Sequence, residues 1–493
     1  MLSVFVFGPN LSAETDRVVV DFSYVEEKAQ SLAKKAFDPP PPIPEELLNL
    51  DYDEYRSIRF NPIRALWSQE ELPFRIELFH LGYLYKEPVV INETTATHKQ
   101  EIPYSSELYN YGEKDDLAKT LPSDLGYAGI RILYPLNDPG VYDEVAVFQG
   151  SSYFRMLSRG QVWGLSARGL AINTGIDESE SFPLFREFWL RKPEEKDREL
   201  LIYALLDGKW ATGAYEFKLI PGDPSRMKIR ATLFFRQIPS RIGLAPFSSM
   251  FWYGENTLDR PDDFRPEVHD SDYLVAESIT GEYIARPLEN TGKVSESFFQ
   301  FDGVKAWGLL QRDRVFENYQ DIQAAYHLRP GGWVEPTNGF GSGSVYLLEI
   351  PVETETVDNI AAMWLPNTPP EKQSPYSFSY DLTSPTMNPS PNGWVQATHQ
   401  GRSDNGRRLI AVDWGGERLA ELSSSENVEV ALQTSPENLV EEFTLEKNPY
   451  NKSWRMVLYL SEPSQDAPDG SLRAFLRLND QILTETWTLP WKP

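Results

Sequence analysis

Two short acidic segments carry aspartates in a setting where a carboxyl group could exchange protons. Asp270 and Asp272 stand in Val268–Asp272 (VHDSD), and Asp358 stands in Thr356–Ile360 (TVDNI). Both segments lie between apolar stretches, where loss of water raises the pKa of a carboxyl group. Cleavage of a glycosidic bond needs one carboxyl group to protonate the leaving oxygen and another to activate water or attack directly. On these residues alone, an Asx turn at the end of a strand is the simpler interpretation of each segment.

Several other chemistries are excluded by residues that the sequence lacks. It has no Cys, which removes thiol nucleophiles, iron–sulfur clusters and Cys-ligated zinc. The five His are dispersed, and no G-x-S-x-G, Walker or H-E-x-x-H motif occurs. We therefore expect no metal and no organic cofactor, although a carboxylate site for a hard cation stays open.

The composition limits the kinds of molecule that the protein can bind. A net charge of −26 over 493 residues disfavours nucleic acid, whose binding needs a basic surface, and it also disfavours an anionic membrane. The chain has 13 Trp, 24 Tyr and 26 Phe. These aromatic residues fit a large β-rich core, and they equally fit a groove in which sugar rings stack.

The spacing of apolar residues predicts an all-β protein. Helical spacing occurs at Val25–Ala36 and stops at Pro39–Pro42. From Ala65 onward the pattern changes to short strands, and the alternation in Met227–Leu233 is typical of a half-buried strand. Many short strands with few helices favour a large antiparallel β-sandwich.

The chain divides into three predicted parts. Residues 1–13 resemble the end of a signal peptide, because the apolar run Met1–Gly8 is followed by small residues before Glu14. Residues 14–385 form the predicted large sandwich. The Pro- and Asn-rich segment Ser384–Gly393 is the predicted linker, and residues 392–493 have the strand spacing of an immunoglobulin-like sandwich.

Several strings of the sequence resemble the periplasmic glucan biosynthesis proteins of the OpgG/OpgD type. The resemblance runs from about Phe22 to Trp487. The strings that carry it include Asp124–Gly129 (DLGYAG), Gly150–Arg155 (GSSYFR), Gly164–Ile172 (GLSARGLAI), Gly243–Pro246 (GLAP), Gly308–Arg312 (GLLQR) and Thr484–Trp487 (TETW).

The resemblance implies a fold, a location and a site. Its members are periplasmic, combine a mutarotase-like β-sandwich with an immunoglobulin-like domain, and act on β-1,2-glucan; some are inverting endo-glucanases. The general acid of the family falls on Asp358. The proposed base, which acts through water and sugar hydroxyls, falls on Asp270, and Tyr326 lies in the expected substrate cleft. For Tyr326, Trp333 and Glu335, sugar contact and core packing both stay open.

The resemblance leaves two functional classes. One is an inverting endo-β-1,2-glucanase or related transglycosylase, and the other is a non-catalytic glucan-binding or assembly factor. A homodimer and a functional link to a membrane glucan synthase are further candidate partnerships. The connection between Ala397 and Arg407 is shorter than the loop that covers the acid in OpgD-type members, which leaves the efficiency of proton transfer open.

Overall fold

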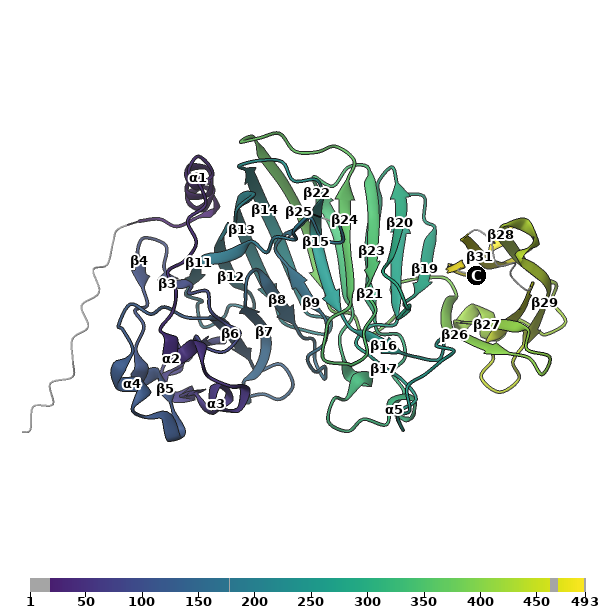
Figure 1. The fold of residues 1–493 in the computed structure, drawn as a ribbon, viewed down its shortest axis with the longest axis horizontal. Helices are drawn as coiled ribbons and strands as arrows, with labels where there is room; N and C mark the ends of the chain where they lie inside the picture. The colour runs from purple at the N-terminus through teal and green to yellow at the C-terminus, as the bar shows by residue number, and fades with distance from the viewer. Residues whose placement is uncertain (1–17, 177, 462–468, 492–493) are drawn as a thin grey trace, which may run out of the picture.

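The computed structural model describes residues 18–176, 178–461 and 469–491, and Figure 1 shows that strands dominate these residues. The all-β prediction is confirmed. The predicted leader, residues 1–13, lies outside the described residues. Among the helices that the structure describes, none is long and apolar enough to cross a membrane.

One layer of the molecule is a ten-stranded sheet, which is antiparallel throughout. Its strands in spatial order are β2 (Arg75–Phe79), β6 (Gly129–Tyr134), β7 (Asp143–Gln149), β8 (Tyr153–Met156), β9 (Ser166–Arg168), β15 (Ile242–Ser249), β24 (Ile360–Pro366), β23 (Gly343–Glu349) and β20 (Ser295–Phe301), with β10 (Ala171–Ile172) paired to β15.

The second layer is a fifteen-stranded sheet that runs through the whole molecule. Its strands in spatial order are β28 (Val428–Ser435), β31 (Gly470–Leu478), β33 (Thr486–Trp491), β19 (Tyr283–Pro287), β18 (Tyr273–Ser278), β21 (Val304–Leu310), β22 (Gly332–Asn338), β25 (Pro375–Thr383), β14 (Arg226–Phe235), β13 (Ala211–Ile220), β12 (Leu200–Asp207), β11 (Leu184–Arg191), β3 (Val90–Thr94) and β4 (Lys99–Glu101), with β32 (Gln481–Ile482) paired to β31.

The two sheets enclose the main core. Residues of period two along each strand point into it, as the alternation in Met227–Leu233 predicts. Aromatic rings meet across the layers: Phe148 of β7 lies 5.0 Å from Phe217 of β13, and Phe247 of β15 lies 5.5 Å from Trp307 of β21. This packing holds the strand ends that carry the candidate site in fixed positions.

Short helices and two small sheets lie outside the two large sheets. The helix α1 (Phe22–Ala33) packs on β12, β13 and β14. It begins earlier than its predicted start because the Asp21 carboxylate accepts a hydrogen bond from the Tyr24 N–H and caps it. The other α-helices are α2 (Glu45–Leu48), α3 (Tyr52–Ser57), α4 (Leu117–Thr120), α5 (Phe316–Tyr319) and α6 (Glu417–Glu421). The two small sheets pair β1 (Arg59–Phe60) with β5 (Tyr109–Asn110), and β16 (Phe251–Tyr253) with β17 (Val268–His269).

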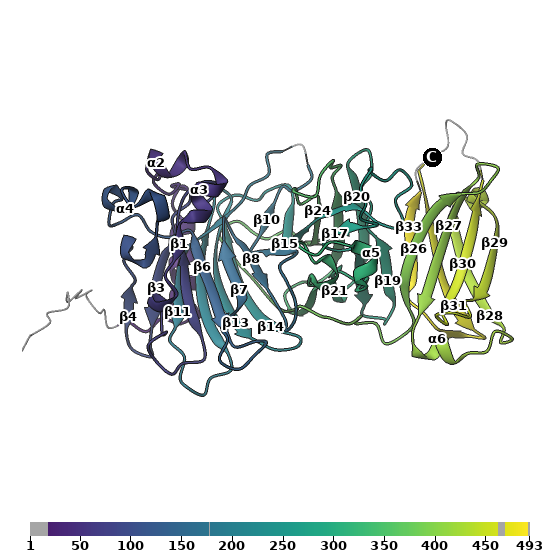
Figure 2. The ribbon, with the colours of Figure 1, turned by 90° about the horizontal axis from the view of Figure 1, so that it is seen from below.

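The C-terminal sandwich shares a sheet with the first one. Its four-stranded layer contains β26 (Trp394–Arg402), β27 (Arg408–Gly415), β30 (Trp454–Leu460) and β29 (Val440–Lys447). Its other layer is the end of the fifteen-stranded sheet, where β33 pairs in parallel with β19 through Ile284 and Thr486 (Figure 2). A common core contains Tyr273 and Trp333 from the first sandwich and Trp414 and Trp487 from the second. The linker at 384–393 connects β25 to β26 and stays a prediction as a domain boundary.

Candidate active site

Asp270 lies immediately after the short strand β17, beneath the end of β16. Its backbone N–H donates to the Met250 carbonyl at 2.8 Å, which fixes the turn. Its side chain is buried, with 5% of the residue exposed, and forms an ion pair with Arg329. A carboxylate in this position is shielded from bulk water and is held by one cation.

Asp358 is brought to the same region by its neighbour Asn359. The buried Asn359 amide accepts from the Phe251 N–H at 2.8 Å and donates to the carbonyls of Phe251 and Ile350, both at 3.0 Å. Phe251 pairs with His269, the residue before Asp270. Asn359 therefore anchors this segment, and Ile360 begins β24. The side chain of Asp358, just before the anchor, is open to solvent.

The surrounding protein displaces water and raises the pKa of both aspartates, and nearby arginines, of which Arg329 is common to both, oppose the rise. For Asp270, burial raises the pKa to about 6; Arg329 lowers it and the charge of Asp358 raises it further. For Asp358, the surrounding protein raises the pKa by displacing water, while Arg155, Arg168 and Arg329 lower it. The charge of Asp358 thus acts on the protonation of Asp270, and the two carboxyl groups share Arg329 as a counter-charge.

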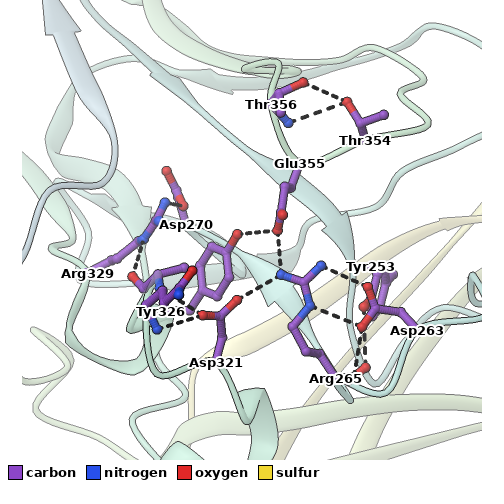
Figure 3. Close-up of polar contacts among 12 residues, drawn as sticks. Tyr253, Asp263, Arg265, Asp270, Asp321, Tyr326, Arg329, Thr354, Glu355 and Thr356 are labelled. Carbon is purple, nitrogen blue, oxygen red and sulfur yellow. Dashed lines mark hydrogen bonds and ion pairs between the residues drawn. The ribbon is translucent and has the colours of Figure 1, made fainter. Parts of the chain in front are cut away.

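Tyr326 belongs to a polar network beside Asp270 (Figure 3). Its hydroxyl donates to Glu355 at 2.6 Å, and its ring lies 4.2 Å from the Arg329 guanidinium carbon. Glu355 also accepts from Arg265 at 2.7 Å, and Arg265 pairs with Asp321 at 2.8 Å. Burial and the bond to Glu355 raise the pKa of Tyr326, so its hydroxyl stays protonated and acts as a donor. The network holds the ring that supports Arg329.

A second network lies behind Asp270. The imidazole of His269 bonds through Nε2 to Glu267 and through Nδ1 to Gln311, both at 2.8 Å. The Gln311 amide also donates to the backbone carbonyls of His269 and Tyr326. Burial opposes a charge on His269, but the hydrogen bond and charge of Glu267 outweigh it and raise the imidazole pKa. Gln311 therefore ties the two segments that carry Asp270 and Tyr326.

The site opens into a groove along the exposed face of the ten-stranded sheet. A pocket of 370 Å³ beside Asp358 is lined by Tyr85, Gln149, Tyr153 and Arg155, among others. It shares Tyr85 and Gln149 with a neighbouring pocket of 550 Å³ that is rich in aromatic residues. The further aromatic residues of the second pocket are Tyr52, Tyr55, Phe60, Phe79 and Tyr109. Together, the two pockets offer flat apolar faces and polar groups, which suit an extended chain of sugar rings.

Trp333 and Glu335 lie apart from this cluster. Trp333 is buried in the core shared with the C-terminal sandwich, so its position favours core packing over sugar contact. Glu335 is half-buried two residues further along β22; burial raises the pKa of Tyr283 on β19, and the charge of Glu335 adds a small part of that rise. The structure thus gathers Asp270, Asp358 and Tyr326 around Arg329 and leaves the other two predicted residues outside this cluster.

One group of side chains could be considered for a cation. Ligand atoms of Glu255, Glu267 and His269 lie within 4.8 Å of one another. Burial raises the pKa of Glu255 well above its usual range, and Glu267 and Asp272 add to the rise. Glu255 also accepts from the Thr398 N–H at 3.2 Å. A protonated carboxyl group hydrogen-bonded within a cluster explains this arrangement without a metal ion.

The comparisons with known proteins identify one family over nearly the whole chain. The family described as periplasmic glucan biosynthesis protein, MdoG, matches residues 20–491. Proteins named Glucans biosynthesis protein G are similar over 94% of this chain: the one from Ralstonia nicotianae is 41% identical and covered to 94%, and those from Pseudomonas aeruginosa and Sodalis glossinidius are 39% and 38% identical and covered to 91%.

The chain belongs to the periplasmic glucan biosynthesis family. Membership supports a role in glucan biosynthesis and confirms the resemblance drawn from the sequence, and the family is described as periplasmic. The residues that sequence reasoning did not single out are Arg329, Glu355 and Arg265. Arg329 follows closely on Tyr326, which the resemblance places in the cleft, so an arginine beside a predicted site residue was the available signal. Glu355 and Arg265 carry no such signal.

Proposed function

We propose that the chain cleaves β-1,2-linked glucan with inversion at the anomeric carbon, or transfers its glycosyl units, with Asp358 as general acid and Asp270 as general base. The observation that carries this proposal is the different exposure of two neighbouring carboxyl groups. Asp358 opens to the groove, whereas Asp270 is buried against Arg329.

The difference in environment supports two separate roles. The raised pKa of Asp358 shifts it toward the protonated form that the leaving oxygen needs, and its solvent access lets that oxygen reach it. Asp270, with a pKa of about 6, is ionised near neutral pH and can accept a proton. Because its carboxylate is buried, the base would receive that proton through intervening water or sugar hydroxyls. Two carboxyl groups with separate tasks are what inversion requires.

The glucan assignment rests on the family and on the groove. The relatives are named for glucan biosynthesis, and the aromatic residues along the groove fit sugar rings. A non-catalytic glucan-binding factor would use the same groove and remains the second candidate. A homodimer and a link to a membrane glucan synthase stay predictions.

Incubation of the purified chain with linear β-1,2-glucan tests the proposal, with chain length followed by chromatography and anomeric configuration by NMR. Asp358→Asn and Asp270→Asn should each lower turnover by the ~10²–10⁴ typical of acid–base groups, while glucan still binds. Asp138→Asn, at an exposed loop position, is the matched control. If both site variants cleave like the parent chain, the assignment is wrong. If the parent binds glucan without ever shortening, cyclising or transferring it, the binding-factor function replaces it.

A further inference from the structure

A further pocket, separate from the two in the groove, lies at the junction of the two sandwiches. Its volume is 370 Å³, and its walls come from the segment after β21, from the 384–393 linker and from the start of β26. We call it the junction pocket; the residues that matter below are Gln311, Arg312, Arg314, Met387, Asn388 and Trp394. It shares no lining residue with the two pockets of the groove.

Among the described residues that line the junction pocket, the buried side-chain atoms without a hydrogen-bond partner are all donors. Arg312 Nε, Arg314 Nε and Asn388 Nδ2 are buried and have no hydrogen-bond partner among the described residues. The Asn388 Oδ1 is already used, because it accepts from the Ser390 N–H at 3.2 Å. Buried donors without partners are unfavourable, so these three nitrogens fit a ligand that supplies acceptor oxygens.

The wall of the junction pocket also carries a positive charge. Arg312 is neutralised by a bidentate pair with Glu485. Arg314 donates to the carbonyls of His327 and Arg329, and in the described part of the chain no carboxylate forms an ion pair with it. The carboxylates of Asp272 and Asp313 act on Arg314 only through space. An anionic group complements this wall better than a neutral hydroxyl does.

The remaining wall is apolar. The indole of Trp394 is only partly buried, and Met387 is 82% exposed, so both present apolar surface to an incoming molecule. A flexible thioether beside an indole accommodates rings and short apolar chains of different shapes. The ligand class therefore combines an anionic head with an apolar or ring-shaped body.

We propose that the junction pocket binds a small molecule that carries a carboxylate or phosphate group on such a body. The proposal does not rest on glucan cleavage. The pocket walls lead directly to the candidate active site, since Gln311 holds the carbonyls of His269 and Tyr326, and Arg314 holds that of Arg329. A bound anion would thus contact the residues that fix Asp270, Tyr326 and Arg329 in place.

Isothermal titration of the full chain tests the proposal with four probes. Phenyl phosphate and benzoate share a ring and differ in the anion, benzyl alcohol lacks the anion, and inorganic phosphate lacks the ring. We expect one of the two ring anions to bind at a single site at least ten-fold more tightly than benzyl alcohol, and which of them binds distinguishes phosphate from carboxylate. Failure of both anions to bind at millimolar concentration overturns the proposal.

Variants locate the bound anion. Asn388→Asp removes the free donor and adds a negative charge to the pocket wall, and it should weaken binding at least ten-fold; Arg314→Met should do the same. Arg198→Met, an exposed arginine elsewhere, should leave affinity unchanged. If Arg314→Met does not fold, Asn388→Asp still decides the question. Anion binding that Arg155→Met abolishes and Asn388→Asp does not would place the anion in the groove and overturn the proposal. Binding of the neutral disaccharide sophorose that Asn388→Asp abolishes would assign the pocket to glucan instead.

Discussion

Arg312, in the first sandwich, and Glu485, just before the last strand of the second, form a buried bidentate ion pair with both bonds at 2.9 Å. Arg312 also donates to the Val395 carbonyl at 2.8 Å, and its backbone N–H donates to Asp272. The segment that carries Asp270 is thereby connected to the C-terminal sandwich through a single arginine.

Glu485→Gln should lower the free energy of unfolding by ~3–5 kcal/mol, because it leaves the Arg312 guanidinium buried without a counter-charge. Urea unfolding followed by circular dichroism measures the loss. Glu429→Gln breaks an exposed pair with Arg477 and should cost no more than about 1 kcal/mol. Equal losses in the two variants would contradict the expected difference between buried and exposed pairs.

Proteolysis within 384–393 should nick the chain without separating its parts. Met387 is highly exposed, so a protease can reach this segment. The C-terminal fragment should stay bound, because β33 pairs with β19 and both sandwiches share the core around Trp333 and Trp487. Size-exclusion chromatography of the nicked protein should give one peak that contains both fragments. A separate peak of the smaller fragment under native conditions would show that the shared core is too weak to hold it.

The rate of glucan cleavage should follow a bell-shaped pH profile. Activity requires Asp270 ionised and Asp358 protonated, and the protein raises the pKa of both groups, so both limbs should reflect these two carboxyl groups and lie above the pH at which a free Asp titrates. Arg329 lowers the pKa of both carboxyl groups, so Arg329→Met should move both limbs to higher pH. Arg198→Met should leave the profile in place. Limbs that stay in place in Arg329→Met would show that the two carboxyl groups do not set the pH profile.

Glu255→Gln should change how stability depends on pH. Burial, with the charges of Glu267 and Asp272, raises the pKa of Glu255 well above 4.5, so the folded state retains a proton that the unfolded chain releases. The contribution of Glu255 to stability is therefore present below pH 4.5. It declines by about 1.4 kcal/mol for each pH unit above that value, until the folded state also loses the proton. The melting temperature of Glu255→Gln should fall less between pH 5 and pH 8 than that of the parent chain. Glu417→Gln, at an exposed position, should follow the parent.

The sequence was sufficient for the fold class, but not for which strands pair or which side chains contact the two candidate aspartates. Alternation predicts β14, yet the same pattern would suit any neighbouring strand, and the parallel pairing of Ile284 with Thr486 has no local signal. Trp333 could not be assigned to core or groove from the sequence, because its burial depends on the core that it shares with the C-terminal sandwich.

The candidate site shows the same limit. Asp270 and Arg329 are separated by 59 positions in the chain, and their contact depends on the turn at Tyr326–Leu328 and on the Gln311 bonds beneath it. No spacing rule relates residues that meet through three separate loops. A resemblance to a family predicts such a contact only where the matching sequence strings contain both residues.

The place of β33 in the fifteen-stranded sheet also bears on the order of folding. Until Thr486–Trp491 docks, the backbone of β19 beside Ile284 and Ala285 has no partner on that side, and an uncovered strand edge can pair with another chain. The sheet of the first sandwich can therefore become complete only after the last strand has emerged and folded. A chain shortened before β33 would expose both this edge and the apolar face around Trp333, so we expect it to be prone to aggregation, although its predicted catalytic residues are intact.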